Sequence, residues 1–171
     1  MHRFETSADL ETGNTNLDDQ VQTLFTMANE ILFSTELAQS HEQFRRAVTY
    51  LVSYLEYHLA AEELAMLERG FSSRRFHTAF HDHVRREART IAASLLRKGT
   101  IEEARSALFF ILEDWIEYHL RTTDRQLASF LSEQASTNGS SELPGIRPLT
   151  ASGKISADFD EQILTRAAGV A

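Results

Sequence analysis

WIEYHLRTTD, residues 115–124, decides the fold that we expect, because it places His119 and Asp124 on a strongly amphipathic helix. Two earlier helical stretches carry side chains of the same kinds, namely His58 with Glu62 and His77 with His81. Metal sites in helix bundles are built from histidines and carboxylates that project inward from facing helices. The three stretches together predict a metal site inside a four-helix bundle.

Four stretches with helical hydrophobic periodicity make up most of the chain. They cover about residues 16–39, 40–69, 73–98 and 100–133. Ser40 and Thr100 have the form of N-caps, each followed three residues later by glutamine or glutamate, and Gly70 suits a helix end. Connections of two or three residues make consecutive helices antiparallel neighbours. The pattern predicts an all-α fold, an up-down-up-down four-helix bundle.

We assign residues 16–134 to the bundle, and the segments on either side differ from it in composition. Residues 1–15 are polar and are expected to form an N-terminal arm. Residues 135–171 are expected to form a flexible C-terminal tail, because serine, threonine, glycine and both prolines are concentrated before residue 154. Apolar residues at Phe159, Ile163 and Leu164 predict one short helix there, which would have to dock on the bundle or on a partner protein.

The composition limits the classes of function. The 171 residues carry a formal net charge of −8, which argues against a general nucleic-acid binder, because such binding relies on clustered lysine and arginine. The absence of cysteine excludes disulfides, thiolate metal ligands and thiol catalysis. No apolar run is long enough for a signal peptide or a membrane span. We therefore expect a cytoplasmic protein that binds neither nucleic acid nor membrane.

The spacing of the polar pairs supports a shared metal. The HxxxE and HxxxH pairs each span one helical turn, so two donor atoms can point at one position. His119 and Asp124 are five residues apart, about 140° around a straight helix. Both can face one centre only if the bundle axis lies between them or if the helix is overwound or bulged. Each pair alone would suit an exposed face, but all six residues lie on inward stripes, where an unpaired polar group costs a few kcal/mol to bury.

The remaining histidines, His2, His41 and His83, are expected to be exposed to solvent. His2 lies in the arm, and His41 begins the second helix about 25 Å from His58 along the axis. His83 is two residues from His81 and so points about 200° away from it.

The order HxxxE, HxxxH, HxxxxD, with adjacent Glu62 and Glu63 and with Trp115 four residues before His119, resembles the hemerythrin and bacteriohemerythrin (HHE cation-binding) family over about residues 17–133. This resemblance implies a non-haem di-iron centre that binds O2 reversibly. It also implies one iron on His77, His81 and His119, a second iron on His58, and Glu62 and Asp124 as bridges. Bacterial members often serve as sensors of O2 or redox state, as O2 carriers or as iron-handling proteins.

The chain departs from this family on the first helix. Family members usually carry a histidine ligand in a segment such as Asp-x-Gln-His, and here Val21 follows Gln20. Valine has no donor atom, and the iron that loses its ligand is the one that binds O2 in the family. The second iron could keep its remaining ligands and become more open, which we favour. Alternatively, a single metal could remain on the three-histidine site, or zinc or manganese could replace iron, because nitrogen and oxygen ligands alone do not select iron.

We therefore expect a hemerythrin-like di-iron protein that binds, senses or handles O2, peroxide or NO, and we assign no catalytic residue. One alternative is a di-iron enzyme of the peroxidase or oxidase type, although no acid–base pair or substrate pocket is legible in the sequence. Another is an interaction protein with weakened metal binding that acts through a partner contact in its tail, at about residues 158–166.

Overall fold

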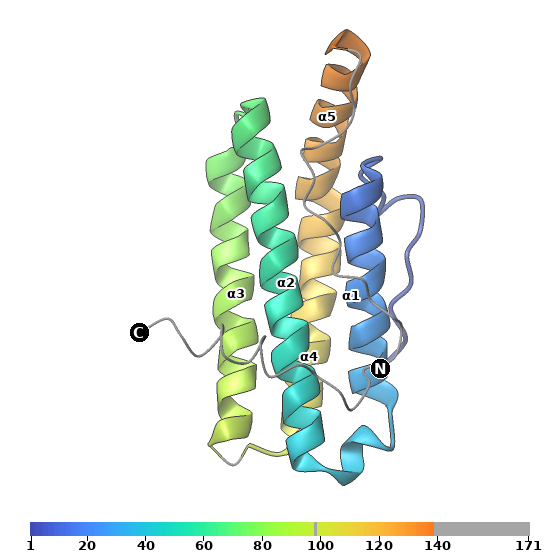
Figure 1. Ribbon diagram of the computed structural model, residues 1–171, viewed down its shortest axis with the longest axis vertical. Helices are drawn as coiled ribbons and strands as arrows, with labels where there is room; N and C mark the ends of the chain where they lie inside the picture. Colours follow the sequence, from blue (N-terminus) through green and yellow to red (C-terminus); the bar gives the residue numbers. More distant parts are fainter. Residues whose placement is uncertain (98, 139–171) are drawn as a thin grey trace.

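Four antiparallel helical rods form the part of the chain that the structure describes. The structure is a computed structural model and describes residues 1–97 and 99–138. Its elements are α1 (Thr15–Phe33), the 3-10 helix η1 (Leu37–Gln39), α2 (His41–Arg69), α3 (Arg74–Leu96), α4 (Ile101–Trp115), the π-helix η2 (Ile116–Asp124) and α5 (Arg125–Asn138). Figure 1 shows α4 and α5 as one continuous fourth rod, with η2 between them. The predicted all-α up-down-up-down bundle is confirmed, and no strand occurs in the described residues.

Capping side chains set the ends of the helices, as the sequence predicts. The hydroxyl of Ser40 accepts a hydrogen bond from the backbone N–H of Gln43 at 3.3 Å at the start of α2. Thr100 and Glu103 cap each other reciprocally at the start of α4. Gly70 ends α2 in the left-handed conformation, with a φ of 69°, which glycine adopts without steric cost.

The first helix ends earlier than the periodicity predicts. The prediction of a helix as far as Gln39 is wrong, because α1 stops at Phe33 and the short η1 follows. Ser34 has an extended backbone, and its hydroxyl accepts a hydrogen bond from the N–H of Leu37 at 3.1 Å. A serine side chain that bonds to nearby backbone in this way competes with continued helix.

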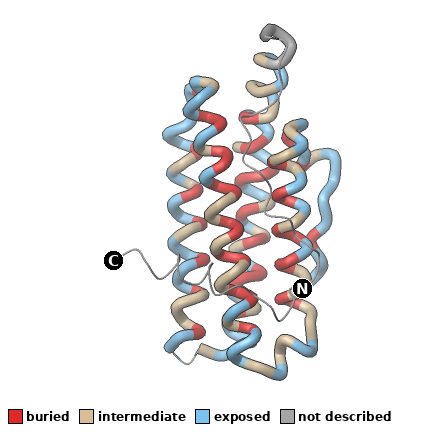
Figure 2. The backbone as a smooth tube through the Cα atoms, viewed as in Figure 1, coloured by how far each residue is buried: buried red, intermediate tan, exposed pale blue. Residues whose placement is uncertain are grey.

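The core lies along the common axis of the four rods, where the buried positions of each helix face one another (Figure 2). On α1 the apolar residues spaced three and four apart are all buried: Leu17, Val21, Leu24, Phe25, Ala28, Ile31 and Leu32. Phe76 of α3 lies outside this core, because its side chain is 84% exposed. His77 is buried, and two consecutive helical residues lie about 100° apart, so both cannot face the same core.

The N-terminal segment before α1 is anchored on the bundle. Phe4 and Leu10 are buried, and the side chain of Asn29 bonds to both the backbone N–H and the carbonyl oxygen of Phe4, at 2.9 and 2.7 Å. Arg121 forms an ion pair with Asp9, so the segment also contacts the fourth rod. The polar composition of residues 1–15 did not indicate these anchors.

The fourth rod continues to Asn138, five residues past the predicted helix end at Glu133. The predicted tail and its short helix near Phe159 lie outside the described residues, apart from residues 135–138. None of the helices in the described part combines the length and the apolar character needed to cross a membrane.

Candidate metal centre

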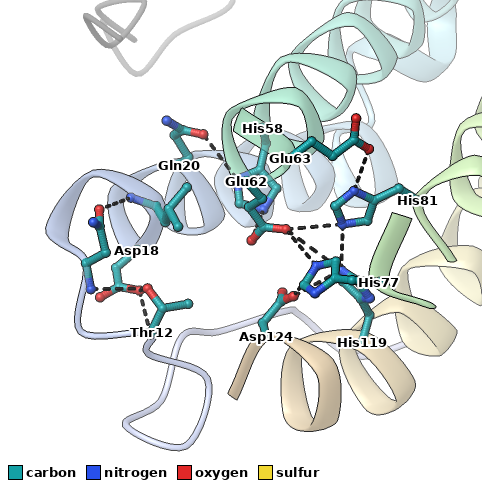
Figure 3. A network of polar contacts seen from close by, with 12 residues as sticks. Thr12, Asp18, Gln20, His58, Glu62, Glu63, His77, His81, His119 and Asp124 are labelled. Carbon is teal, nitrogen blue, oxygen red and sulfur yellow. Dashed lines mark hydrogen bonds and ion pairs between the residues drawn. The ribbon is translucent and has the colours of Figure 1, made fainter. Parts of the chain in front are cut away.

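Six buried side chains from three rods meet at the bundle axis (Figure 3). They are His58 and Glu62 from α2, His77 and His81 from α3, and His119 and Asp124 from η2. All six have a relative exposure of 0%. The structure thus brings together every residue that the sequence marks as a candidate metal ligand.

The π-helix η2 accounts for the five-residue spacing on the fourth rod. Backbone hydrogen bonds in a π-helix join residues five apart, so His119 and Asp124 lie on the same face, one turn apart. Nε2 of His119 lies 3.0 Å from Oδ1 of Asp124. Of the two arrangements that the spacing allows, the bulged helix is the one observed.

Five donor atoms have the mutual distances of one coordination shell. Nε2 of His81 and Nε2 of His119 are 2.9 Å apart, and Oδ1 of Asp124 is 3.1 Å from Nε2 of His77. Oε2 of Glu62 lies 3.3, 3.2 and 3.9 Å from the Nε2 atoms of His77, His81 and His119. Donors at right angles around a metal with bonds of about 2.1 Å are about 3.0 Å apart. Glu62 and the three histidines could therefore hold one metal ion, with Asp124 beside them.

A second group of donor atoms has no hydrogen-bond partner within the described residues. It consists of Nε2 of His58, Oε1 of Glu62 and both carboxylate oxygens of Asp124. The His58 and Glu62 atoms lie 3.4 Å apart without hydrogen-bond geometry. An unsatisfied buried polar group costs about 1–3 kcal/mol. A cation beside Nε2 of His58 and Oε1 of Glu62 would satisfy these two atoms, and Glu62 offers one oxygen to each group, as a bridging carboxylate does.

Hydrogen bonds fix the ring orientation of two of the histidines. Nδ1 of His58 donates to Oε1 of Gln20 at 3.1 Å, and Nδ1 of His81 donates to Oε1 of Glu63 at 2.8 Å. Arg85 holds the same Glu63 oxygen at 2.8 Å. Because Nδ1 carries a hydrogen in both rings, Nε2, which faces the centre, is the nitrogen left to bind a metal.

Aromatic rings enclose the centre. The ring of Phe80 stacks on that of His119 with centroids 4.7 Å apart and planes 8° apart. Trp115 meets the ring of His58 edge-on at 5.8 Å, and Phe71 meets His77 edge-on at 6.3 Å. These rings limit the access of water, which strengthens electrostatic interactions inside the site.

Burial and mutual charge shift the pKa values of these groups. Burial lowers the pKa of His58, so its ring is neutral and keeps a lone pair. Burial acts in the same direction on His119, but the carboxylates of Asp124 and Glu62 outweigh it and raise the pKa of His119 to about 9. For Glu62, burial acts to raise the pKa, but the histidines around its carboxylate hold it well below its usual range. The metal-free site therefore retains anionic carboxylates beside a protonated His119.

The first rod contributes Gln20 to the centre. Val21, the position at which the sequence lacks a histidine, is 3% exposed and lies in the apolar core. Gln20 is also buried, and its Nε2 donates to Oδ1 of Asn16 at 3.1 Å while its Oε1 receives the bond from His58. The first rod therefore supports a ligand candidate through Gln20 although it offers no donor atom at Val21.

Neither Gln20 nor Glu63 was among the site residues predicted from the sequence. A signal was available for Gln20 in its helical spacing to buried residues of α1. It lies three residues after the buried Leu17 and four residues before the buried Leu24, so it shares the inward face of the helix. A polar residue at such a position is usually hydrogen-bonded to another buried group. Glu63 offered no comparable signal, because its partner His81 is on another helix.

The three histidines outside the centre are exposed, as predicted. They are His2, His41 and His83. Nε2 of His41 lies 2.9 Å from the carbonyl oxygen of Gly99, which joins the start of α2 to the α3–α4 connection.

Comparison with known proteins supports the reading of this centre as a cation site. The family model described as the hemerythrin HHE cation binding domain matches residues 12–131. This span includes the six convergent side chains and Gln20. Neither the curated proteins nor the solved structures gave a significant match.

Proposed function

The chain belongs to the hemerythrin HHE cation-binding domain family, and on this premise we propose that it is a non-haem di-iron protein that binds, senses or handles O2, peroxide or NO in the cytoplasm. Iron held by nitrogen and carboxylate ligands supplies redox chemistry toward such small molecules. The absence of cysteine agrees with this compartment.

The observation that carries the proposal is the arrangement of the buried donors in two groups. His77, His81 and His119 would hold one iron, and His58 would help to hold the other. Glu62 and Asp124 would bridge the two, since each carboxylate has two oxygens and no described group other than the histidines approaches them.

Val21 makes the second iron position the more open one. Its side chain fills space in the core and offers no lone pair, so the second iron would have His58 as its one histidine ligand, against three at the first. Gln20 would keep Nε2 of His58 directed at the second position.

The metal content of the full chain, purified without chelators, tests the proposal. We expect about two irons per chain, together with near-ultraviolet absorption that bleaches on reduction and returns in air. One tightly held iron would contradict the di-iron proposal and favour the mononuclear alternative. Zinc, manganese or no metal would contradict both readings.

Substitution Val21→His tests the assignment of the missing ligand. The new imidazole should raise the retention of the second iron and prolong the lifetime of the O2-bound state, measured by iron titration and by absorbance after mixing with air. Gln22→His is the matched control, because Gln22 is exposed on the same helix. If Val21→His changes neither quantity, residue 21 is not the ligand position.

A further inference from the structure

An elongated apolar groove runs along the outside of the bundle between α3 and the fourth rod. It encloses about 610 Å³, and its apolar lining includes Phe80, Val84, Ile91, Phe110, Ile111 and Tyr118. Phe110 and Tyr118 are each 64% exposed. Large apolar side chains that gather on an exposed face of a folded domain often mark an interaction surface.

The shape of the groove suits a row of side chains. Its lining extends from Glu103 to Tyr118 on the fourth rod and from Phe80 to Ser94 on α3, which at 1.5 Å per residue is about 21–23 Å. The groove, of about 610 Å³, is open to solvent along this length and does not enclose the body of a helix, about 10 Å across. It is wide enough for the ridge of apolar side chains along one face of a helix laid in the groove.

The rim of the groove is acidic. Glu87, Glu103 and Asp114 line it, and no lysine or arginine does so among the described residues. Glu103 caps α4, whereas Glu87 and Asp114 are exposed and have no ion-pair partner in the described part of the chain. An occupant with basic residues beside its apolar ridge would complement this rim.

The same charges disfavour the two occupants that the chain itself could supply. A symmetric dimer through this face would bring the two acidic rims together, because a two-fold interface pairs the same patch on both copies. The apolar segment near the C-terminus carries Asp158, Asp160 and Glu161 but only Arg166 as a cation. Both pairings would place like charges opposite one another.

We propose that this groove is a docking site for a basic amphipathic helix of a partner protein. Apolar residues of the partner at positions i, i+4, i+7 and i+11 lie in the groove, and lysines or arginines beside them face Glu87 and Asp114. The proposal rests on the shape and the charges of the groove, and it does not depend on which metal the centre holds.

Synthetic peptides of about 15 residues, the length of the groove, provide the test. The probe has leucine at the four ridge positions and lysine on either side, and fluorescence anisotropy measures its binding to the full chain. One control peptide has the same composition in scrambled order, and the other replaces lysine with glutamate. We expect the basic amphipathic peptide to bind at least tenfold more tightly than either control, and equal binding would overturn the proposal.

Variants of the protein locate the binding surface. Phe110→Asp and Ala107→Trp, both at exposed groove positions, should weaken peptide binding at least tenfold, and Glu87→Lys with Asp114→Lys should weaken it about tenfold. Leu67→Asp is the matched control, because Leu67 is 57% exposed and does not line the groove, and it should leave binding unchanged. Unchanged binding to a folded Phe110→Asp variant would overturn the proposal.

Two further outcomes would identify a different occupant and also overturn it. The first is a dimer of the full chain, seen in sedimentation, that Phe110→Asp dissociates. The second is peptide binding that appears only after residues 139–171 are deleted, which would make the C-terminal segment the occupant.

Discussion

At the scale of single residues, Gln20 is the polar group whose role follows most directly from its contacts. Its Oε1 accepts from Nδ1 of His58, and its Nε2 is held by Asn16 one turn earlier on α1. Removal of the acceptor would free the His58 ring to rotate and would leave Nδ1–H unpaired in a buried site.

Gln20→Leu should therefore lower the affinity of the second metal by about 10–100-fold, the usual effect of losing a partner that orients a ligand. The first metal should be retained, because Gln20 does not contact the three-histidine group. Metal titration with a competing chelator separates the two affinities. Gln22→Leu, an exposed change on the same helix, is the control. Equal losses at both sites would show that the substitution acts on the fold.

The pKa values of the metal-free site predict a pH dependence of metal binding. His119 has a pKa raised to about 9, and the pKa of His77 is also raised, although burial opposes both shifts. Metal binding requires neutral imidazoles, so it must displace these protons. Affinity should thus increase from pH 6 to about pH 9, by about tenfold per pH unit for each proton displaced. Glu62 and Asp124, whose pKa values are lowered, are already ionised in this range and contribute no dependence.

Calorimetric titration in buffers of different ionisation enthalpy counts the released protons directly. A flat affinity between pH 6 and pH 9, with no proton release, would contradict the charge state that we assign to the metal-free centre.

At the scale of secondary-structure elements, η2 is the stretch of the fourth rod that contains one residue more than a regular α-helix would need. A π-helical bulge is rare and is found mostly at functional sites. Deleting one residue inside it would shorten the spacing of His119 and Asp124 from five to four, the one-turn spacing of an α-helix. Both residues would still share a face, and the register of Leu127 beyond them would be kept.

Deletion of the exposed Thr122 should accordingly convert η2 to α-helix, keep the metal-binding capacity and leave the core intact. Urea unfolding and metal titration measure both properties, and we expect stability equal to or greater than that of the parent chain. Deletion of Leu127, beyond the bulge, is the contrasting variant, because it removes a buried core residue. Loss of metal binding on deletion of Thr122 would mean that the bulge itself shapes the site.

Much of this arrangement was predictable from local sequence signals. Periodicity and the caps at Ser40, Gly70 and Thr100 predicted the rods, and the spacing of the histidine pairs predicted which faces turn inward. The end of α1 at Phe33 was not predictable in this way, because Ser34 competes with the helix through its own side chain. The anchoring of Phe4 depends on Asn29, 25 residues away, and such long-range contacts leave no local pattern.

At the scale of the whole molecule, we expect a bound cation to stabilise the folded chain. Six side-chain atoms of the candidate ligands lack hydrogen-bond partners in the described residues, and a metal that binds only the folded chain stabilises it by mass action. At a free metal concentration of 100 times Kd this effect is about 2.7 kcal/mol, which corresponds to a Tm increase of roughly 5–10 °C.

Thermal unfolding followed by circular dichroism, with iron or with chelator under anaerobic conditions, measures this increase. A His119→Ala variant should show a smaller increase in Tm with iron than the parent chain, because it lacks one histidine ligand of the first metal position. A wild-type Tm that does not respond to chelation would exclude a structural contribution of the metal.

The ring of Phe80 contacts the metal centre and the groove at once, since it stacks on His119 and also lines the groove between α3 and the fourth rod. Metal binding and helix docking are then two equilibria that share a side chain. Thermodynamic linkage requires that any factor by which the metal changes the affinity for the helix equals the factor by which the helix changes the affinity for the metal. With a favourable factor, an abundant partner would let the chain retain iron at lower iron concentrations, so that iron retention would report on how much partner the cell contains.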